Sequence, residues 1–269
     1  MSVVGRAAVQ GAERLGLFDA VKWYAREAPR PAAAKVENVL AKSPAMEARA
    51  RRIVDTGRRM VGSLRWQGGT KLDEEAGWRL SEKTLWGRDN DFGRWMRGTG
   101  PEPGLSGTMA CTDAVMYIAH RAGAVDEATL RRIHEEAADA ASAAWRERGD
   151  SWPAECAFWK VMDDHLLRGE RTHFEVDPAL GIGGPDIPAG HVVMINNSHA
   201  MTSLGTRDAQ GRQEVLSHWV HPERMPPDDG TDQPFGRLQQ TSVQEVVASM
   251  NYGYALPIDS AAPFWLLDT

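Results

Sequence analysis

Cysteine is scarce in this chain, because only Cys111 and Cys156 occur among its 269 residues. Two cysteines are too few for the disulfide framework of a small secreted domain or for a cysteine-rich zinc site. Hydrophobic runs are short as well, and none approaches the roughly 20 apolar residues of a membrane-spanning helix. Residues 1–16 also lack the continuous apolar stretch of a secretory signal, since charged and polar side chains interrupt them. These absences predict a protein that is cytoplasmic or that is secreted without a cleavable signal peptide.

Basic residues are in the minority: 31 Lys and Arg stand against 37 Asp and Glu, which gives a formal net charge of −6. This balance argues against electrostatic binding of the whole chain to nucleic acid or to an anionic membrane. A hydrophobic content of 42% with 25% charged residues is ordinary for a globular protein and excludes global disorder. No spacing of histidine, cysteine and carboxylate side chains matches a zinc signature, and we expect no metal or cofactor.

The order of the expected elements predicts an α+β fold, with helices first and an antiparallel sheet after them. Apolar spacing predicts helices at residues 3–27, 32–60 (broken near Pro44), 111–122, 126–148, 154–168 and 242–250. Strands are expected after the turn at 188–190, at 199–205, at 214–220 and near 252–256. We expect a helical and Trp-rich N-terminal extension at 1–100 and a catalytic domain at 101–269, with a loop at 98–104 between them. Residues 1–60 are interpreted either as a helical subdomain packed on the main domain or as a segment that docks a partner.

Cys111 is the first candidate for chemistry. It stands at the expected start of an apolar helix, where the helix dipole and unpaired N–H groups stabilise a thiolate and lower its pKa. The same N–H groups can hold the oxyanion that forms during acyl transfer. The alternative is a buried cysteine that acts as a small hydrophobic residue.

His199 is the candidate base, because it opens an expected strand that can pack against the Cys111 helix. A third polar residue should orient its imidazole. If Gly205 lies opposite Glu214 in the hairpin, His218 shares a face with His199 and is its diagonal neighbour. A slip of one residue would turn His218 away. Other polar residues therefore remain as alternatives for the third position: Glu214, Ser217 and His221.

Three segments of the sequence resemble the NlpC-like papain-fold cysteine peptidases. Residues 107–123 look like the nucleophile helix of that family, with Cys111 in the position of the nucleophile. Residues 188–194 and 199–205 look like its two strands that carry the base. The resemblance covers roughly residues 104–220, and it implies a papain-like helix bundle packed on an antiparallel sheet.

The resemblance implies that Cys111 and His199 form a catalytic Cys-His pair, which acts on amide or other acyl bonds through a thioester. A third polar residue, such as His218, usually completes the site in this family. The leading expected substrate is a peptidoglycan peptide or a protein. Similar domains occur as toxin modules of bacterial secretion systems, so a secretion carrier, a chaperone or an immunity protein are expected partners. Protein deamidation, transglutamination or a catalytically silent binding module of the same fold are the alternatives.

Overall fold

The computed structural model describes residues 44–66, 90–148, 187–195, 199–218 and 236–246, together with short strand segments at 167–168, 176–177, 181–182 and 261–266. Several of the sequence predictions lie outside these residues: the helix at 3–27, most of the helix at 154–168, the strand near 252–256, Cys156 and His221. No helix in the described part of the chain is long and apolar enough to cross a membrane.

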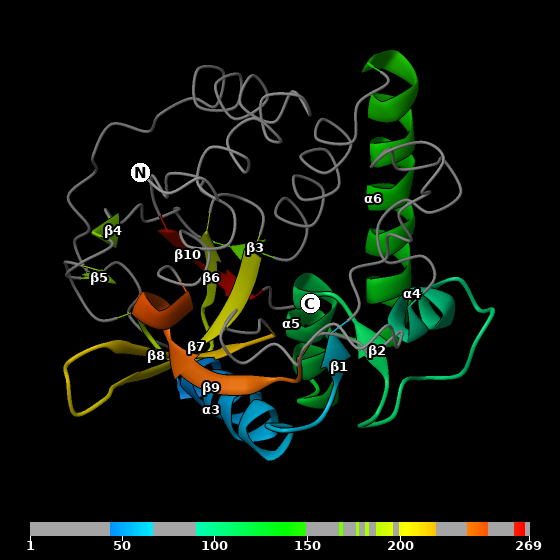
Figure 1. The fold of residues 1–269 in the computed structure, drawn as a ribbon. Coiled ribbons are helices and arrows are strands. Elements are labelled where there is room, and N and C mark those ends of the chain that lie inside the picture. The colour runs from blue at the N-terminus through cyan, green and yellow to red at the C-terminus, as the bar shows by residue number, and fades with distance from the viewer. Residues whose placement is uncertain are drawn as a thin grey trace, which may run out of the picture.

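Helices and an antiparallel sheet make up the described fold, so the α+β prediction is confirmed at this level (Figure 1). The helices are α3 (Pro44–Arg59), α4 (Asp91–Met96), α5 (Cys111–Arg121) and α6 (Glu127–Arg148). The six-stranded sheet has the order β3-β10-β6-β7-β8-β9, and all of its neighbours are antiparallel. Its strands are β3 (Leu167–Arg168), β6 (Val192–Ile195), β7 (His199–Arg207), β8 (Gln213–Ser217), β9 (Gln239–Ser242) and β10 (Ala261–Leu266). Two short pairs complete it: β1 (Arg65–Trp66) runs parallel to β2 (Thr108–Met109), and β4 (Val176–Asp177) is antiparallel to β5 (Gly181–Ile182).

Helix α5 confirms the sequence prediction at both of its ends. It begins at Cys111, directly after β2 and the N-cap residue Ala110. It ends at Arg121, and Gly123 follows with a φ of 68°, the left-handed conformation in which a glycine costs least. Residues 111–119 are all buried, so this helix runs through the interior of the protein.

One face of the sheet, which we call the α5 face, packs against α5. Ala200, Leu204 and Leu216 belong to the same hydrophobic core as the buried side chains of α5. Gly57 of α3 lies so close that an added Cβ would stand 2.3 Å from Leu216 Cδ1 and 3.3 Å from Ile118 Cγ2. Helices α3 and α5 therefore meet on this face, beside β7 (Figure 1).

The core that surrounds α5 also includes side chains from well before residue 100. Ile53, Met60, Phe92 and Trp95 are at most 4% exposed and belong to this core. Phe92 and Trp95 of α4 pack edge-on against the ring of Tyr117, with ring centroids 6.5 and 6.0 Å apart. A single hydrophobic core thus spans both sides of the boundary that the sequence suggested.

The predicted register of the hairpin formed by β7 and β8 is wrong by one residue. Met201 lies opposite Ser217, not opposite His218, and Ser203 lies opposite Val215. Near the turn, however, Arg207 lies opposite Gln213, so an irregularity between residues 203 and 207 shifts the pairing. The prediction assumed a symmetric turn and had no means of locating this bulge.

Two further corrections concern strands. Leu167 and Arg168, expected at the end of a helix, form β3 and pair with β10. β9 and β10 were not predicted, although each supplies one neighbour of the central strands. Helix α4 is a helix of six residues within the Trp-rich region that the sequence places before residue 100.

Candidate active site

Cys111 occupies the first position of α5, and a buried polar network fixes this end of the helix. The N-cap residue Ala110 has no side chain that can cap the helix, so its own N–H donates to Asp113 Oδ2 at 2.9 Å. Asn90 Nδ2 donates to the same oxygen at 2.7 Å, while Asn90 Oδ1 accepts from the N–H of Gly93. The carboxylate of Asp113 therefore ties the start of α5 to the start of α4, in the manner of one half of a capping box.

The thiol of Cys111 is only 9% exposed, and its pKa moves opposite to the sequence expectation. Burial raises the pKa of Cys111 to about 11, outweighing the hydrogen bond from the backbone N–H of Ala200, which lowers it. The negative charge of Asp113 raises it further. The prediction of a thiolate stabilised by the helix terminus is therefore wrong, because desolvation exceeds what the terminal N–H groups contribute. The thiol is neutral at physiological pH.

His199 is the first residue of β7 and is 1% exposed. Its Nε2 lies 2.9 Å from the hydroxyl oxygen of Ser217 on β8. Burial lowers the pKa of His199 to about 3, and charge repulsion from His218 contributes. Ser217, one of the alternatives named from the sequence, is thus the polar neighbour that holds this imidazole.

His218, also 1% exposed, directly follows β8 and makes different contacts. Its Nε2 lies 3.0 Å from the carbonyl oxygen of Leu64, in the segment between α3 and β1. Burial lowers the pKa of His218 to about 4, against the raising effect of the carbonyls of Leu64 and Ala110. His218 therefore lies beside Ala110, the residue immediately before Cys111.

The observed register does not pair Met201 with His218, which was the basis for predicting that His199 and His218 share a face of the sheet. Side chains alternate along a strand, and Leu216 is on the α5 face, so Ser217 is on the opposite face. The ring of His199 is hydrogen-bonded to the hydroxyl of Ser217, so it lies on the same face of the sheet as Ser217. His218 follows the last residue of β8, and its ring lies beside the carbonyls of Leu64 and Ala110. The earlier expectation failed because it depended on the register that the bulge shifts.

The structure thus brings three of the predicted residues to one region. Ala200, next to His199, donates its N–H to the sulfur of Cys111, and Ala110, next to Cys111, lies near His218. Glu214, by contrast, accepts hydrogen bonds from Thr206 and Gln240.

The sequence reasoning missed Asp113, Asn90 and Leu64. An acidic residue two positions after the cysteine is a signal for helix capping that could have been used. The contact between the Leu64 carbonyl and His218 could not be predicted. The two residues are 154 positions apart, and a contact made by a backbone oxygen leaves no pattern of side chains in the sequence.

No protein-family model matches this chain, and neither the curated proteins nor the solved structures contain a match to it. Within the part of the chain that the structure describes, no group of three or more histidine, cysteine or carboxylate side chains is placed to hold a metal ion. The assignment of function therefore depends on the geometry of the region around Cys111.

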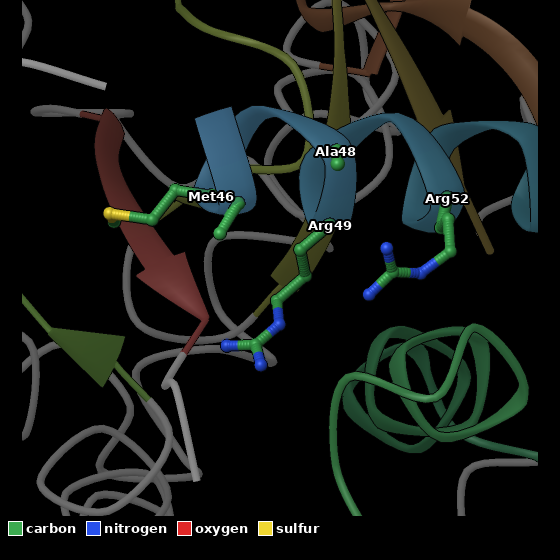
Figure 2. Close-up of a pocket in the computed structure, with 5 residues that line it drawn as sticks. Met46, Ala48, Arg49 and Arg52 are labelled. Atoms are coloured by element: carbon green, nitrogen blue, oxygen red, sulfur yellow. The ribbon is translucent and has the colours of Figure 1, made fainter. Parts of the chain in front are cut away.

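A separate pocket of about 170 Å³ lies on α3. Figure 2 shows the side chains of Arg49 and Arg52 extending from the helix on this side, with Met46 near the first turn. Arg52 Nε donates to the carbonyl of Ala122 at 3.4 Å, so this guanidinium also links α3 to the end of α5. None of the candidate site residues lines this pocket, and we base no function on it.

Proposed function

We propose that this chain is a cysteine hydrolase of papain-like fold that cleaves amide or peptide bonds through a thioester. The observation that carries the proposal is the position of Cys111: it is the first residue of a buried helix, and its sulfur accepts the N–H of Ala200, the neighbour of the buried His199 on β7. A second buried histidine, His218, follows β8 and lies beside Ala110. A thiol at a helix N-terminus next to imidazole groups is an arrangement suited to nucleophilic acyl transfer.

In the proposed reaction the sulfur of Cys111 attacks the carbonyl carbon as its proton passes to a histidine. The N–H groups at the start of α5 stabilise the negative charge that develops on the carbonyl oxygen. The C–N bond then breaks, the leaving amine takes the proton from the imidazolium, and water hydrolyses the thioester. The pKa of His199 is lowered to about 3 and that of His218 to about 4, so both imidazoles are neutral at pH 7. Because these values lie far below the pKa of the Cys111 thiol, the proton must move as the sulfur attacks and not before.

For the substrate we propose a peptidoglycan peptide, on the basis of the resemblance of residues 107–123, 188–194 and 199–205 to the NlpC-like peptidases. An antibacterial effector is the biological role that fits this substrate. Protein deamidation or transglutamination would use the same thioester and differ only in the group that attacks or leaves.

The experiment compares wild type with Cys111→Ala on peptidoglycan fragments and on candidate protein substrates, with products identified by mass spectrometry. Cys156→Ala serves as the matched control for loss of a thiol. We expect a product that forms with wild type and Cys156→Ala but not with Cys111→Ala. The product mass separates the reactions, since hydrolysis splits the substrate, deamidation converts an amide to an acid, and transglutamination joins two chains.

A second candidate function is a catalytically silent binding module of the same fold. The burial of Cys111 and the raised pKa of its thiol favour this alternative. It predicts that Cys111→Ala binds peptidoglycan fragments as tightly as wild type and that neither protein releases a product.

A further inference from the structure

Arg65 and Arg237 lie directly opposite each other in an isolated antiparallel bridge between β1 and the segment that precedes β9. The N–H of Trp66 donates to the carbonyl of Gly236, so the two arginines form a non-hydrogen-bonded pair, in which the Cα atoms stand about 4.5 Å apart. Opposite residues share a face of a ladder, so both side chains leave the same face. Like charges in this arrangement repel each other, and the pair is destabilising unless an anion lies between them.

Neither guanidinium forms an ion pair with a carboxylate of the residues that the structure describes. Arg65 Nε donates to the carbonyl of Ser106 at 2.8 Å, and Arg237 Nη1 donates to the carbonyl of Gly62 at 3.1 Å. A guanidinium has five N–H donors, so one such contact orients each side chain and leaves most of its donors for a ligand. Arg237 is exposed and Arg65 is half-buried, so a ligand can reach both.

Most of the other arginines in the described chain have a partner or a position that accounts for them. Asp91, whose carboxylate contacts Thr108 on the neighbouring strand β2, is already ion-paired with Arg94. Arg58 and Arg59 lie in the last turn of α3, where the helix dipole favours positive charge. The other arginines that pair with carboxylates are Arg51, Arg121, Arg131, Arg132 and Arg212.

The pair of arginines lies beside the segment that leads to Cys111. Strand β1 runs parallel to β2, and Arg65 stands opposite Thr108, three residues before Cys111 (Figure 1). At about 3.3 Å per residue, three residues correspond to roughly 10 Å along the strand direction. An extended peptide covers this distance with about three residues. A group held by the two arginines can therefore belong to the same peptide as an acyl group at Cys111.

A carboxylate is the anion that fits two neighbouring guanidinium groups on a peptide. Its two oxygens accept charge-assisted hydrogen bonds from the planar forks of N–H donors that arginine presents. A nucleic acid is bound by a longer row of cations that face successive phosphates, and this chain has a formal net charge of −6. The observed pair therefore favours one carboxylate of a peptide over a polyanion.

We propose that Arg65 and Arg237 form a carboxylate-binding subsite for a peptide whose acyl group lies at Cys111. The substrate is then an acidic peptide, with a carboxylate about three residues from the bond that is cleaved. This inference rests on the proposed function for the word substrate, because a silent binding module would hold the same acidic peptide as a ligand.

The test measures peptide binding to the intact chain that carries Cys111→Ala, so that no peptide is consumed. The probes are a peptidoglycan stem tetrapeptide and the same peptide with its carboxylates converted to amides, titrated by calorimetry. We expect Arg65→Gln and Arg237→Gln each to bind the carboxylate form at least about 10-fold more weakly than the parent protein, the scale of one lost charge-assisted hydrogen bond. The amide form should bind weakly and equally to all three proteins.

Glutamine keeps an amide donor for the carbonyl of Ser106 or Gly62, and urea unfolding establishes that each variant is folded. Arg51→Gln is the matched control, because it also removes one exposed positive charge but lies on α3 in an ion pair with Glu47. Equal binding of the two peptide forms by the parent protein, no binding of either, or an equal loss in Arg51→Gln would overturn the proposal. Tighter binding of a single-stranded RNA oligonucleotide than of the carboxylate peptide would overturn it as well.

A second measurement uses the wild-type side chains at both positions and does not depend on the variants folding. Phenylglyoxal modifies accessible guanidinium groups, and mass spectrometry gives the rate at each arginine. We expect the carboxylate peptide to slow modification of Arg65 and Arg237 but not of Arg51, and unchanged rates at all three would refute the subsite. Carboxylate-dependent binding without a Cys111-dependent product would count against the proposed hydrolase alone. A Cys111-dependent product whose formation is indifferent to both arginines would count against this inference alone.

Discussion

Alkylation of Cys111 by iodoacetamide tests how far burial controls the reactivity of the thiol. The reagent reacts with the thiolate, so the rate follows the fraction of thiol that is deprotonated. Raising the pKa from 9.0 to about 11 lowers the thiolate fraction at neutral pH by about 100-fold. Since the side chain is only 9% exposed, limited access slows the reaction further.

The assay follows the mass of the peptide that contains Cys111 over time, in the native protein and in the same protein unfolded by concentrated urea. We expect native Cys111 to react at least about 100-fold more slowly than in urea near pH 7. The native rate should keep rising with pH well beyond the range in which an ordinary thiol has ionised. The unfolded protein controls for the intrinsic reactivity of this cysteine and its neighbours.

Rapid labelling near pH 6 would refute this reasoning, because it requires a pKa well below the ordinary value. Such a result would restore the expectation, made from the sequence, that the helix terminus produces a standing thiolate. With slow labelling, the proposed reaction needs the thiol proton to leave only as the sulfur attacks, whereas the silent binding module needs no such step.

Three further predictions concern the framework of the site. Deletion of residues 1–60 removes three large buried side chains, Ile53, Val54 and Met60, worth about 5–9 kcal/mol in total, and should abolish cooperative urea unfolding; a folded 61–269 fragment would contradict this. Burial raises the pKa of Asp113 to about 6, so its contribution to stability is present below about pH 4 and lost as the pH rises through 6. Relative to Asp113→Asn, the wild-type free energy of unfolding should therefore fall by about 3 kcal/mol over this range, and parallel pH profiles would refute the shift. Ser217→Ala removes the hydroxyl from His199 Nε2 and should lower the free energy of unfolding by about 1–3 kcal/mol, and an unchanged value would show that this contact contributes nothing.

Local signals in the sequence were sufficient to predict several elements. The apolar spacing of residues 111–122 and the glycine at 123 predicted α5 with its first residue correct. The helix expected at 126–148 is α6, and Asp126 Oδ1 accepts from the N–H of Thr129 at its start. The turn at 188–190 and the strands β6, β7 and β8 were also expected close to their observed positions. In each case the determining residues lie within a few positions of the element.

Features that depend on distant partners could not be predicted in this way. The bulge between Ser203 and Arg207 requires knowledge of the pairing on both sides of the turn, and it places Ser217 instead of His218 opposite Met201. Strand β9 has exposed and half-buried residues in most positions and forms only because β8 offers an edge. The contact between Leu64 and His218 is likewise a tertiary feature, made by a strained backbone that the sequence does not reveal.

The raised pKa of Cys111 was missed for a similar reason. A helix terminus can be located from the sequence, but the depth of burial cannot. Residues 111–119 are buried along their whole length, which follows from the packing of α3, α4 and the sheet around α5. The cost of desolvation then exceeds the favourable local field.

The central claim is that Cys111 forms a covalent acyl intermediate. Its most direct test is acid quenching of wild-type protein during incubation with peptidoglycan stem peptides, followed by mass spectrometry of the peptide that contains Cys111. We expect an acyl adduct on Cys111 that hydroxylamine removes, because hydroxylamine cleaves thioesters. Turnover of the same peptides by Cys111→Ala, or product release by wild type with no adduct at any quench time, would contradict it.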